Sequence, residues 1–164
     1  MRGSTFIAVS AVLMLGCNDS RRLSDPDHRL MRFADVLATS QAAHGLRHRF
    51  CMKLAEHPDR SETCAALRGL ISTMEARIAD HPEDGPRCPE GKGTPEEKDR
   101  CSCEWAWVQI GAAKKAPAAW TALVVENNLE TLPKTPPSSF LAEMEQAAEE
   151  QAAKFWTLGC KPPR

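Results

Sequence analysis

Tyrosine, strand-like alternation and clustered positive charge are all missing from this chain. It has no tyrosine, only 5% aromatic residues, and no useful stretch in which apolar and polar residues alternate as in a half-buried β-strand. These absences argue against a sheet protein. Lysine and arginine are interspersed with acidic residues and the formal net charge is −1, so the basic patch that nucleic acids or anionic lipids attract is absent. We expect no nucleic-acid partner.

Motifs of common enzymes are also missing. There is no G-x-S-x-G nucleophile motif and no C-x-x-C-H haem attachment sequence. The segment "EGKGT", Glu90 to Thr94, ends like a phosphate-binding loop, but its glycine spacing is wrong and no strand precedes it. We therefore expect a non-enzymatic protein without a cofactor.

The N-terminus has the order of residue types that is typical of exported proteins. Arg2 precedes an apolar stretch from Thr5 to Leu15, and the small Gly16 follows. Charged, apolar and small residues in this order are typical of a secretory signal peptide. Crossing a bilayer takes about 20 apolar residues. The run is too short for that, so a transmembrane anchor is not expected.

Met14, Leu15, Gly16 and Cys17 resemble the lipobox of bacterial lipoproteins, although Met14 stands where Leu is commonest and Leu15 where a smaller residue is usual. The resemblance implies that residues 1–16 are removed, that Cys17 is acylated, and that residues 17–27 tether the lipid to the domain. Asn18 stands where Asp would retain an enterobacterial lipoprotein in the inner membrane. The implied place is therefore the bacterial cell envelope, at the outer membrane, facing the periplasm or the exterior. An ordinary signal peptide is the alternative.

The remaining cysteines agree with export. Without residues 1–16 the chain has 164 − 16 = 148 residues, enough for one domain, expected at 28–164. Six cysteines follow Cys17, and an even number in an exported chain predicts three disulfide bonds. They are Cys51, Cys64, Cys88, Cys101, Cys103 and Cys160.

Apolar residues at spacings of three and four predict an all-α fold, a small bundle of about five helices held by disulfide bonds. The predicted helices run from Asp27 to Glu56, from about Ser61 to Ile78, from a capping box at Thr94, from Pro117 to before Thr131, and from Ser139 to Leu158. On the first helix one face is expected to be buried; it carries Leu30, Phe33, Leu37, His44, His48 and Cys51. Gly45 either kinks this helix or admits a close neighbour.

Helix geometry limits how the cysteines pair. Cys51 and Cys64 lie nearly symmetrically about the turn at His57 and Pro58, so we predict a bond between them, worth about 3 kcal/mol. Cys101 and Cys103 point to opposite sides of one helix. They must therefore pair with Cys88 and Cys160, in an order that spacing does not determine.

Three groups of residues are candidates for function. His44, His48 and Cys51 lie on one helix face and could hold a metal ion or a small ligand, which would make the protein a carrier; two hydrogen-bonded histidines in a bundle are the simpler interpretation. The four tryptophans could surround a small-molecule pocket, but core packing explains them too.

The third candidate is the loop from Asp80 to Gly93, which is longer than most connections and contains Glu90 and Lys92. The favoured function is an envelope lipoprotein that acts as a structural module or binds a protein partner, with this loop as the binding face.

Overall fold

The computed structural model describes residues 26–162, and within them it contains α-helices, two short 3-10 helices and no strand. The all-α fold is confirmed. The elements are α2 (Pro26–Phe50), η1 (Pro58–Arg60), α3 (Ser61–Asp80), η2 (Pro82–Asp84), α4 (Pro95–Glu126) and α5 (Ser138–Thr157).

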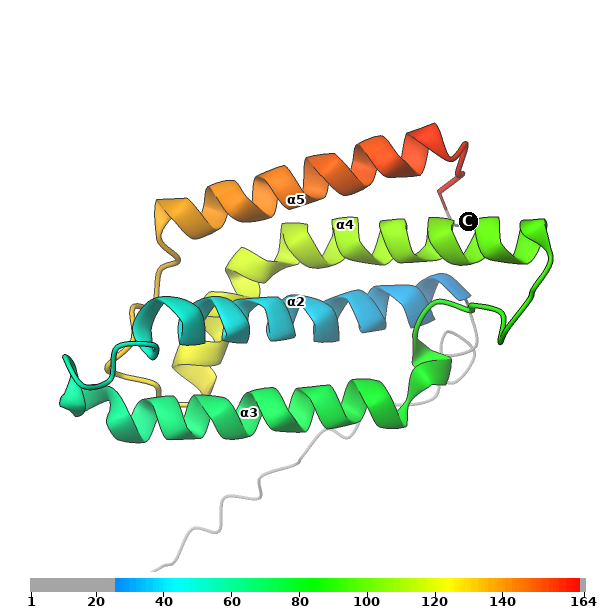
Figure 1. Ribbon diagram of the computed structural model, residues 1–164. Coiled ribbons are helices and arrows are strands. Elements are labelled where there is room, and N and C mark those ends of the chain that lie inside the picture. The colour runs from blue at the N-terminus through cyan, green and yellow to red at the C-terminus, as the bar shows by residue number, and fades with distance from the viewer. Residues whose placement is uncertain (1–25, 163–164) are drawn as a thin grey trace, which may run out of the picture.

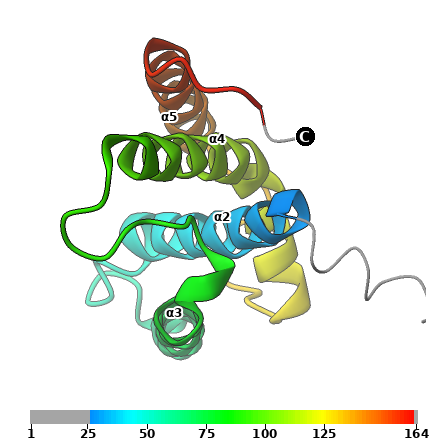
Figure 2. The ribbon, with the colours of Figure 1, turned by 90° about the vertical axis from the view of Figure 1, so that its right-hand side faces the viewer.

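The four helices are stacked in the order α3, α2, α4, α5 (Figure 1). Seen from the end, α4 lies between α2 and α5, whereas α3 covers the other side of α2 (Figure 2). The start of α2, the start of α4 and the end of α5 lie at one end of the bundle, which we call the N-terminal end. The far end is where α2 ends and α3 begins.

One predicted helix boundary is wrong. Pro117 was expected to begin a fourth helix, but it lies inside α4, so the described bundle has four α-helices and not five. A proline within a helix removes one hydrogen bond and bends the axis, and α4 changes direction where its colour turns yellow (Figure 1). Its neighbours Ala116 and Trp120 are fully buried, which keeps both halves of the helix packed.

The first helix also differs from expectation. It ends at Phe50, and the residues to Glu56 form turns. The buried line follows a spacing of four and consists of Leu30, Ala34, Ala38, Ala42 and Leu46. His44 and His48 are exposed, so the prediction that they belong to the buried stripe is wrong. Small alanines, which a search for large apolar residues overlooks, form the contact with α4.

The main core surrounds Trp120 at the far end. Its fully buried indole donates a hydrogen bond from Nε1 to the carbonyl oxygen of Pro133 at 2.9 Å, and its ring centroid lies 4.7 Å from that of Phe140. Gly45 lets these rings approach α2, because a Cβ atom there would lie 2.6 Å from Phe140 Cε2. The glycine therefore admits a close neighbour. Leu46, Leu67 and Leu132 complete this core.

Two small clusters fill the N-terminal end, one on each side of α4. On the α2 side, Phe33 packs edge-on against Trp105 with ring centroids 5.8 Å apart. On the α5 side, Trp107 and Phe155 lie 5.7 Å apart. α4 is therefore buried on two sides, which agrees with the prediction that Cys101 and Cys103 point to opposite sides of it.

In residues 26–162, three disulfide bonds each attach a non-helical segment to a helix, and the predicted pair Cys51–Cys64 is one of them. Cys101 and Cys103 are not bonded to each other, as expected. Cys101 pairs with Cys88 and Cys103 with Cys160, which settles the order that spacing left open.

Predictions for the N-terminal segment lie outside the described residues. These are the signal peptide 1–16, the acylation of Cys17 and most of the tether 17–27; α2 begins at Pro26, two residues before the expected boundary of the domain at 28–164. From residue 26 to residue 162, no helix combines the length and hydropathy that a membrane span requires.

Candidate functional site

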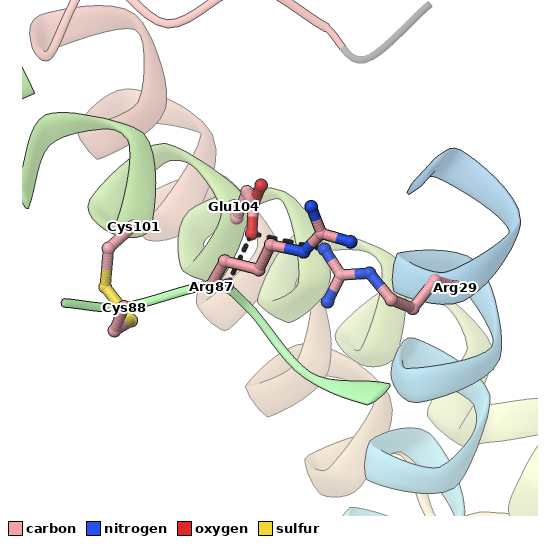
Figure 3. The surroundings of a disulfide bond; sticks show 5 residues. All are labelled: Arg29, Arg87, Cys88, Cys101 and Glu104. Atoms are coloured by element: carbon pink, nitrogen blue, oxygen red, sulfur yellow. Dashed lines mark hydrogen bonds and ion pairs between the residues drawn. A yellow bond between two sulfur atoms is a disulfide. The ribbon is translucent and has the colours of Figure 1, made fainter. Parts of the chain in front are cut away.

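The loop between α3 and α4 is attached to the bundle at several points. Gly85 and Pro86 are buried against the first cluster, since a Cβ atom on Gly85 would lie 3.2 Å from the ring of Phe33. Cys88, three residues after Gly85, is bonded to Cys101 in the second turn of α4. The bond links the middle of the loop to a helix (Figure 3).

An ion pair holds the part of the loop before Cys88 (Figure 3). Arg29 of α2 and Glu104 of α4 are paired at 3.4 Å between Nη2 and Oε2, and their side chains are only 9% and 18% exposed. The same Oε2 accepts a hydrogen bond from the backbone N–H of Arg87 at 2.7 Å. Arg29 Nη1 also donates to the carbonyl oxygen of Glu83 at 3.4 Å. One carboxylate thus joins α2, α4 and the loop.

Sequence reasoning did not identify Arg29 and Glu104. One feature of the sequence could have pointed to Glu104: it is a charged residue between Cys103 and Trp105, on a helix whose two cysteines point to opposite sides. A charge in such a place requires a partner. Nothing in the chain's pattern indicates that the partner is Arg29, 75 residues away.

The loop tip, residues 89–93, is also constrained. Gly91 has φ +74°, a left-handed conformation that favours glycine, and a Cβ atom on Gly93 would lie 2.2 Å from Pro89 Cβ. The tip leads into the predicted capping box, which the structure confirms. Thr94 Oγ1 accepts from the N–H of Glu97 at 3.3 Å, and the Glu97 carboxylate accepts from the N–H of Thr94 at 2.9 Å.

Glu90 and Lys92 are both exposed at this tip. They present one negative and one positive side chain on a backbone that is fixed on both sides. Such an arrangement can recognise a complementary surface, whereas the tip brings together no nucleophile and general base.

At the start of the loop, η2 stabilises a carboxylate. The pKa of Glu83 lies below its usual range. The main cause is a hydrogen bond from the residue's own backbone N–H, and the second is a hydrogen bond with His81, whose Nδ1 lies 3.0 Å from Glu83 Oε1. Glu83 is exposed, so this interaction is a minor contribution to the loop.

The candidate ligands His44, His48 and Cys51 do not form a set. Cys51 is bonded to Cys64 and therefore cannot act as a thiolate ligand. His44 Nε2 lies 3.2 Å from Glu75 Oε1 on α3, an exposed pair. Across the residues whose side chains are described, no group of three or more His, Cys, Asp or Glu is placed to hold a metal ion. The bridged Cys51 counts against the carrier hypothesis.

The tryptophans are distributed over different parts of the molecule. Trp120 is in the main core, Trp105 and Trp107 are in the small clusters, and Trp156 is 65% exposed. Core packing is thus the role of three of the four.

Comparisons of the chain with protein-family models, with curated proteins and with solved structures found no significant match.

Proposed function

We propose that this protein is a lipid-anchored component of the bacterial cell envelope that binds a protein partner through the loop between α3 and α4 and catalyses no reaction. The disulfide bonds are the main support for the proposed location in the cell envelope. They use all six cysteines after Cys17, which fits a protein of an oxidising compartment. The order of residues in the first 17 positions fits the same route.

The loop is proposed as the binding face because it is already ordered in the unbound protein and would lose little conformational entropy on binding. Binding by a flexible loop loses affinity when the loop becomes ordered, and cross-links reduce that loss. Here the Cys88–Cys101 bond, the contacts of Glu104 and the Thr94 cap hold both sides of the tip. Glu90 and Lys92 are then presented in one arrangement, which favours a specific partner over a general one.

Metabolic labelling with an alkyne fatty acid tests the anchor. The full chain, produced in a bacterium, should carry the label, and mass spectrometry should find its N-terminus at Cys17. The variant Cys17→Ala should lose the label completely, while the matched variant Cys51→Ala/Cys64→Ala should keep it. A mature chain that is cut near residue 16 but never labelled would instead establish an ordinary signal peptide.

Site-specific photo-cross-linking tests the binding face. A photoreactive residue at position 92 should give one discrete cross-linked product in envelope fractions, and the charge reversal Glu90→Lys should reduce its yield several-fold. The control position is Met52, which is 66% exposed at the far end of the bundle. Equal products from positions 52 and 92 would argue against the loop as the binding face.

A further inference from the structure

α4 lies between α2 and α5, and the side of α4 that carries Lys114 has no helix packed on it within the described residues. A groove runs along each edge of this side. The groove between α2 and α4, about 220 Å³, is lined by Leu30, Met31, Trp107 and Ile110. The groove between α4 and α5, about 500 Å³, is lined by Ala113, Pro117, Leu141, Ala148 and Ala152. Lys114 lines both grooves, so both open on the same side of α4.

Large apolar side chains are exposed on this side. Met31 is 43% exposed at the edge of the first groove. Trp156 follows Ala152 by one helical turn, so it continues the α5 edge of the second groove, and it is the most exposed tryptophan at 65%. We call the surface formed by Met31, Trp107, Ile110, Leu141 and Trp156 the outer face.

Charged residues also line the two grooves, and their signs are unequally distributed. Lys114 is central, and Lys115 forms an ion pair with Asp35. Glu145 and Glu149 line the α5 edge of the second groove, the same edge that Trp156 continues. A surface with this pattern suits a largely apolar contact, in which a lysine can bury its methylene chain and keep its ammonium group in water.

The outer face includes the first turns of α2, the described part of the chain that is nearest to Cys17 in the sequence. Met31 is in the second turn of α2, and Pro26, where α2 begins, is nine residues after Cys17. Nine residues span about 30 Å at most. A lipid on Cys17 would therefore keep the start of α2 within that distance of a bilayer.

The loop between α3 and α4, the proposed binding face, lies on the opposite side of α4 from the outer face. Cys103 is one turn before Trp107 and holds Cys160 on the outer-face side, whereas Cys101, which points the other way, holds Cys88. Figure 2 shows the loop and the C-terminal segment on opposite sides of α4. A support at the outer face would leave the loop exposed.

We propose that the outer face rests on the phospholipid bilayer in which Cys17 is anchored, with Trp156 and Met31 at the boundary between headgroups and acyl chains. Tryptophan favours this boundary because its ring is apolar and its N–H is polar. The contact adds a second membrane signal to the lipid and orients the loop away from the membrane. This inference rests on the proposed function.

Vesicle flotation of the mature chain carrying Cys17→Ser measures the contact without the lipid. The probe is vesicles of phosphatidylethanolamine and phosphatidylglycerol. We expect binding that changes little with salt and that falls about tenfold or more in Met31→Ser/Trp156→Ser. The control is Met52→Ser at the far end, a position as exposed as Trp156 and more exposed than Met31, which should bind as the parent does. Equal binding by all three would overturn the proposal.

Fluorescence quenching in the lipidated protein gives a second readout. Brominated phosphatidylcholine should quench tryptophan emission in proteoliposomes, and Trp156→Phe should remove most of the quenching. Circular dichroism should show unchanged helix content, since the exposed indole is not part of a core. No quenching, or equal quenching in Trp156→Phe, would contradict the bilayer contact.

The outcomes separate this inference from the proposed function. If Cys17 is acylated but Trp156 is not quenched, the anchor stands and the bilayer contact is wrong. If Cys17 is not acylated but the double variant still loses vesicle binding, the contact stands and the anchor is wrong. A dimer that Trp156→Ser dissociates, with no vesicle binding, would show that a second copy covers the outer face and would overturn the lipid assignment.

Discussion

The two ends of the bundle are stabilised in different ways. At the far end, one large cluster around Trp120 joins all four helices and the segment after α4, with the single disulfide bond Cys51–Cys64 beside it. At the N-terminal end there are only two small clusters, but two disulfide bonds attach the loop and the C-terminal segment to α4. Covalent links are therefore concentrated where the apolar core is smallest.

The same contrast holds for polar interactions. In the main core, the buried indole N–H of Trp120 has a backbone acceptor. At the N-terminal end, the charged side chains of Arg29 and Glu104 are mostly buried and joined to the loop. A buried ion pair adds little net stability but defines a geometry, because breaking it leaves an unpaired charge. The N-terminal end thus favours a fixed loop, whereas the far end supplies most of the apolar burial.

Removing the centre of the main core should have the largest effect. Trp120→Ala should lower the free energy of unfolding by about 4 kcal/mol, because it leaves a cavity and loses the bond to Pro133. Trp156→Ala, at the exposed position, should change it by less than about 0.5 kcal/mol. Urea denaturation followed by circular dichroism measures both. Similar losses in the two variants would mean that the far end does not dominate stability.

Removing the disulfide bond that closes the longest loop should have an effect of similar size. Cys103→Ala/Cys160→Ala opens a link across 57 residues and should cost about 4 kcal/mol in the loop-entropy model. Cys51→Ala/Cys64→Ala opens one across 13 residues and should cost about 3 kcal/mol. Thermal unfolding of the oxidised proteins gives the comparison. A larger loss for the shorter link would mean that native packing, and not loop length, determines the value.

Two glycines in helices should respond in opposite directions. Gly45→Ala should destabilise the protein by about 1 kcal/mol, because crowding against Phe140 outweighs the better helix propensity of alanine. Gly69→Ala has no atom within 4 Å of the new Cβ and should stabilise by roughly 0.5–1 kcal/mol. Denaturant midpoints measure both. A stabilising Gly45→Ala would show that the main core has room there.

The smallest effect concerns Glu83 at the N-terminal end. Its pKa is lowered in the folded protein by its own backbone N–H and then by His81, so its contribution to stability is present above the ordinary pKa of the carboxyl group. That contribution is lost as the pH falls through the lowered value. In an NMR titration, His81→Ala should raise the midpoint of Glu83. An unchanged midpoint would assign the whole shift to the backbone.

Local patterns predicted some features and failed on others for physical reasons. The Cys51–Cys64 bond followed from symmetry about one turn, and the Thr94 cap from three neighbouring residues. Pro117 was expected to separate two helices, but burial of the residues around it keeps α4 continuous. His44 and His48 were expected to be buried but are exposed. The expectation failed because spacing alone does not reveal that small alanines form the contact with α4.

The sequence by itself determined the fold class, the number of disulfide bonds and one of the three pairings, because helix periodicity, capping and a single turn depend on residues close together in the chain. Only the tertiary structure decided how Cys88 and Cys160 pair, that Arg29 meets Glu104, and that the loop and the outer face lie on opposite sides of α4. These contacts join distant residues, so they depend on how the helices are stacked and on which side chains are small enough to let them approach.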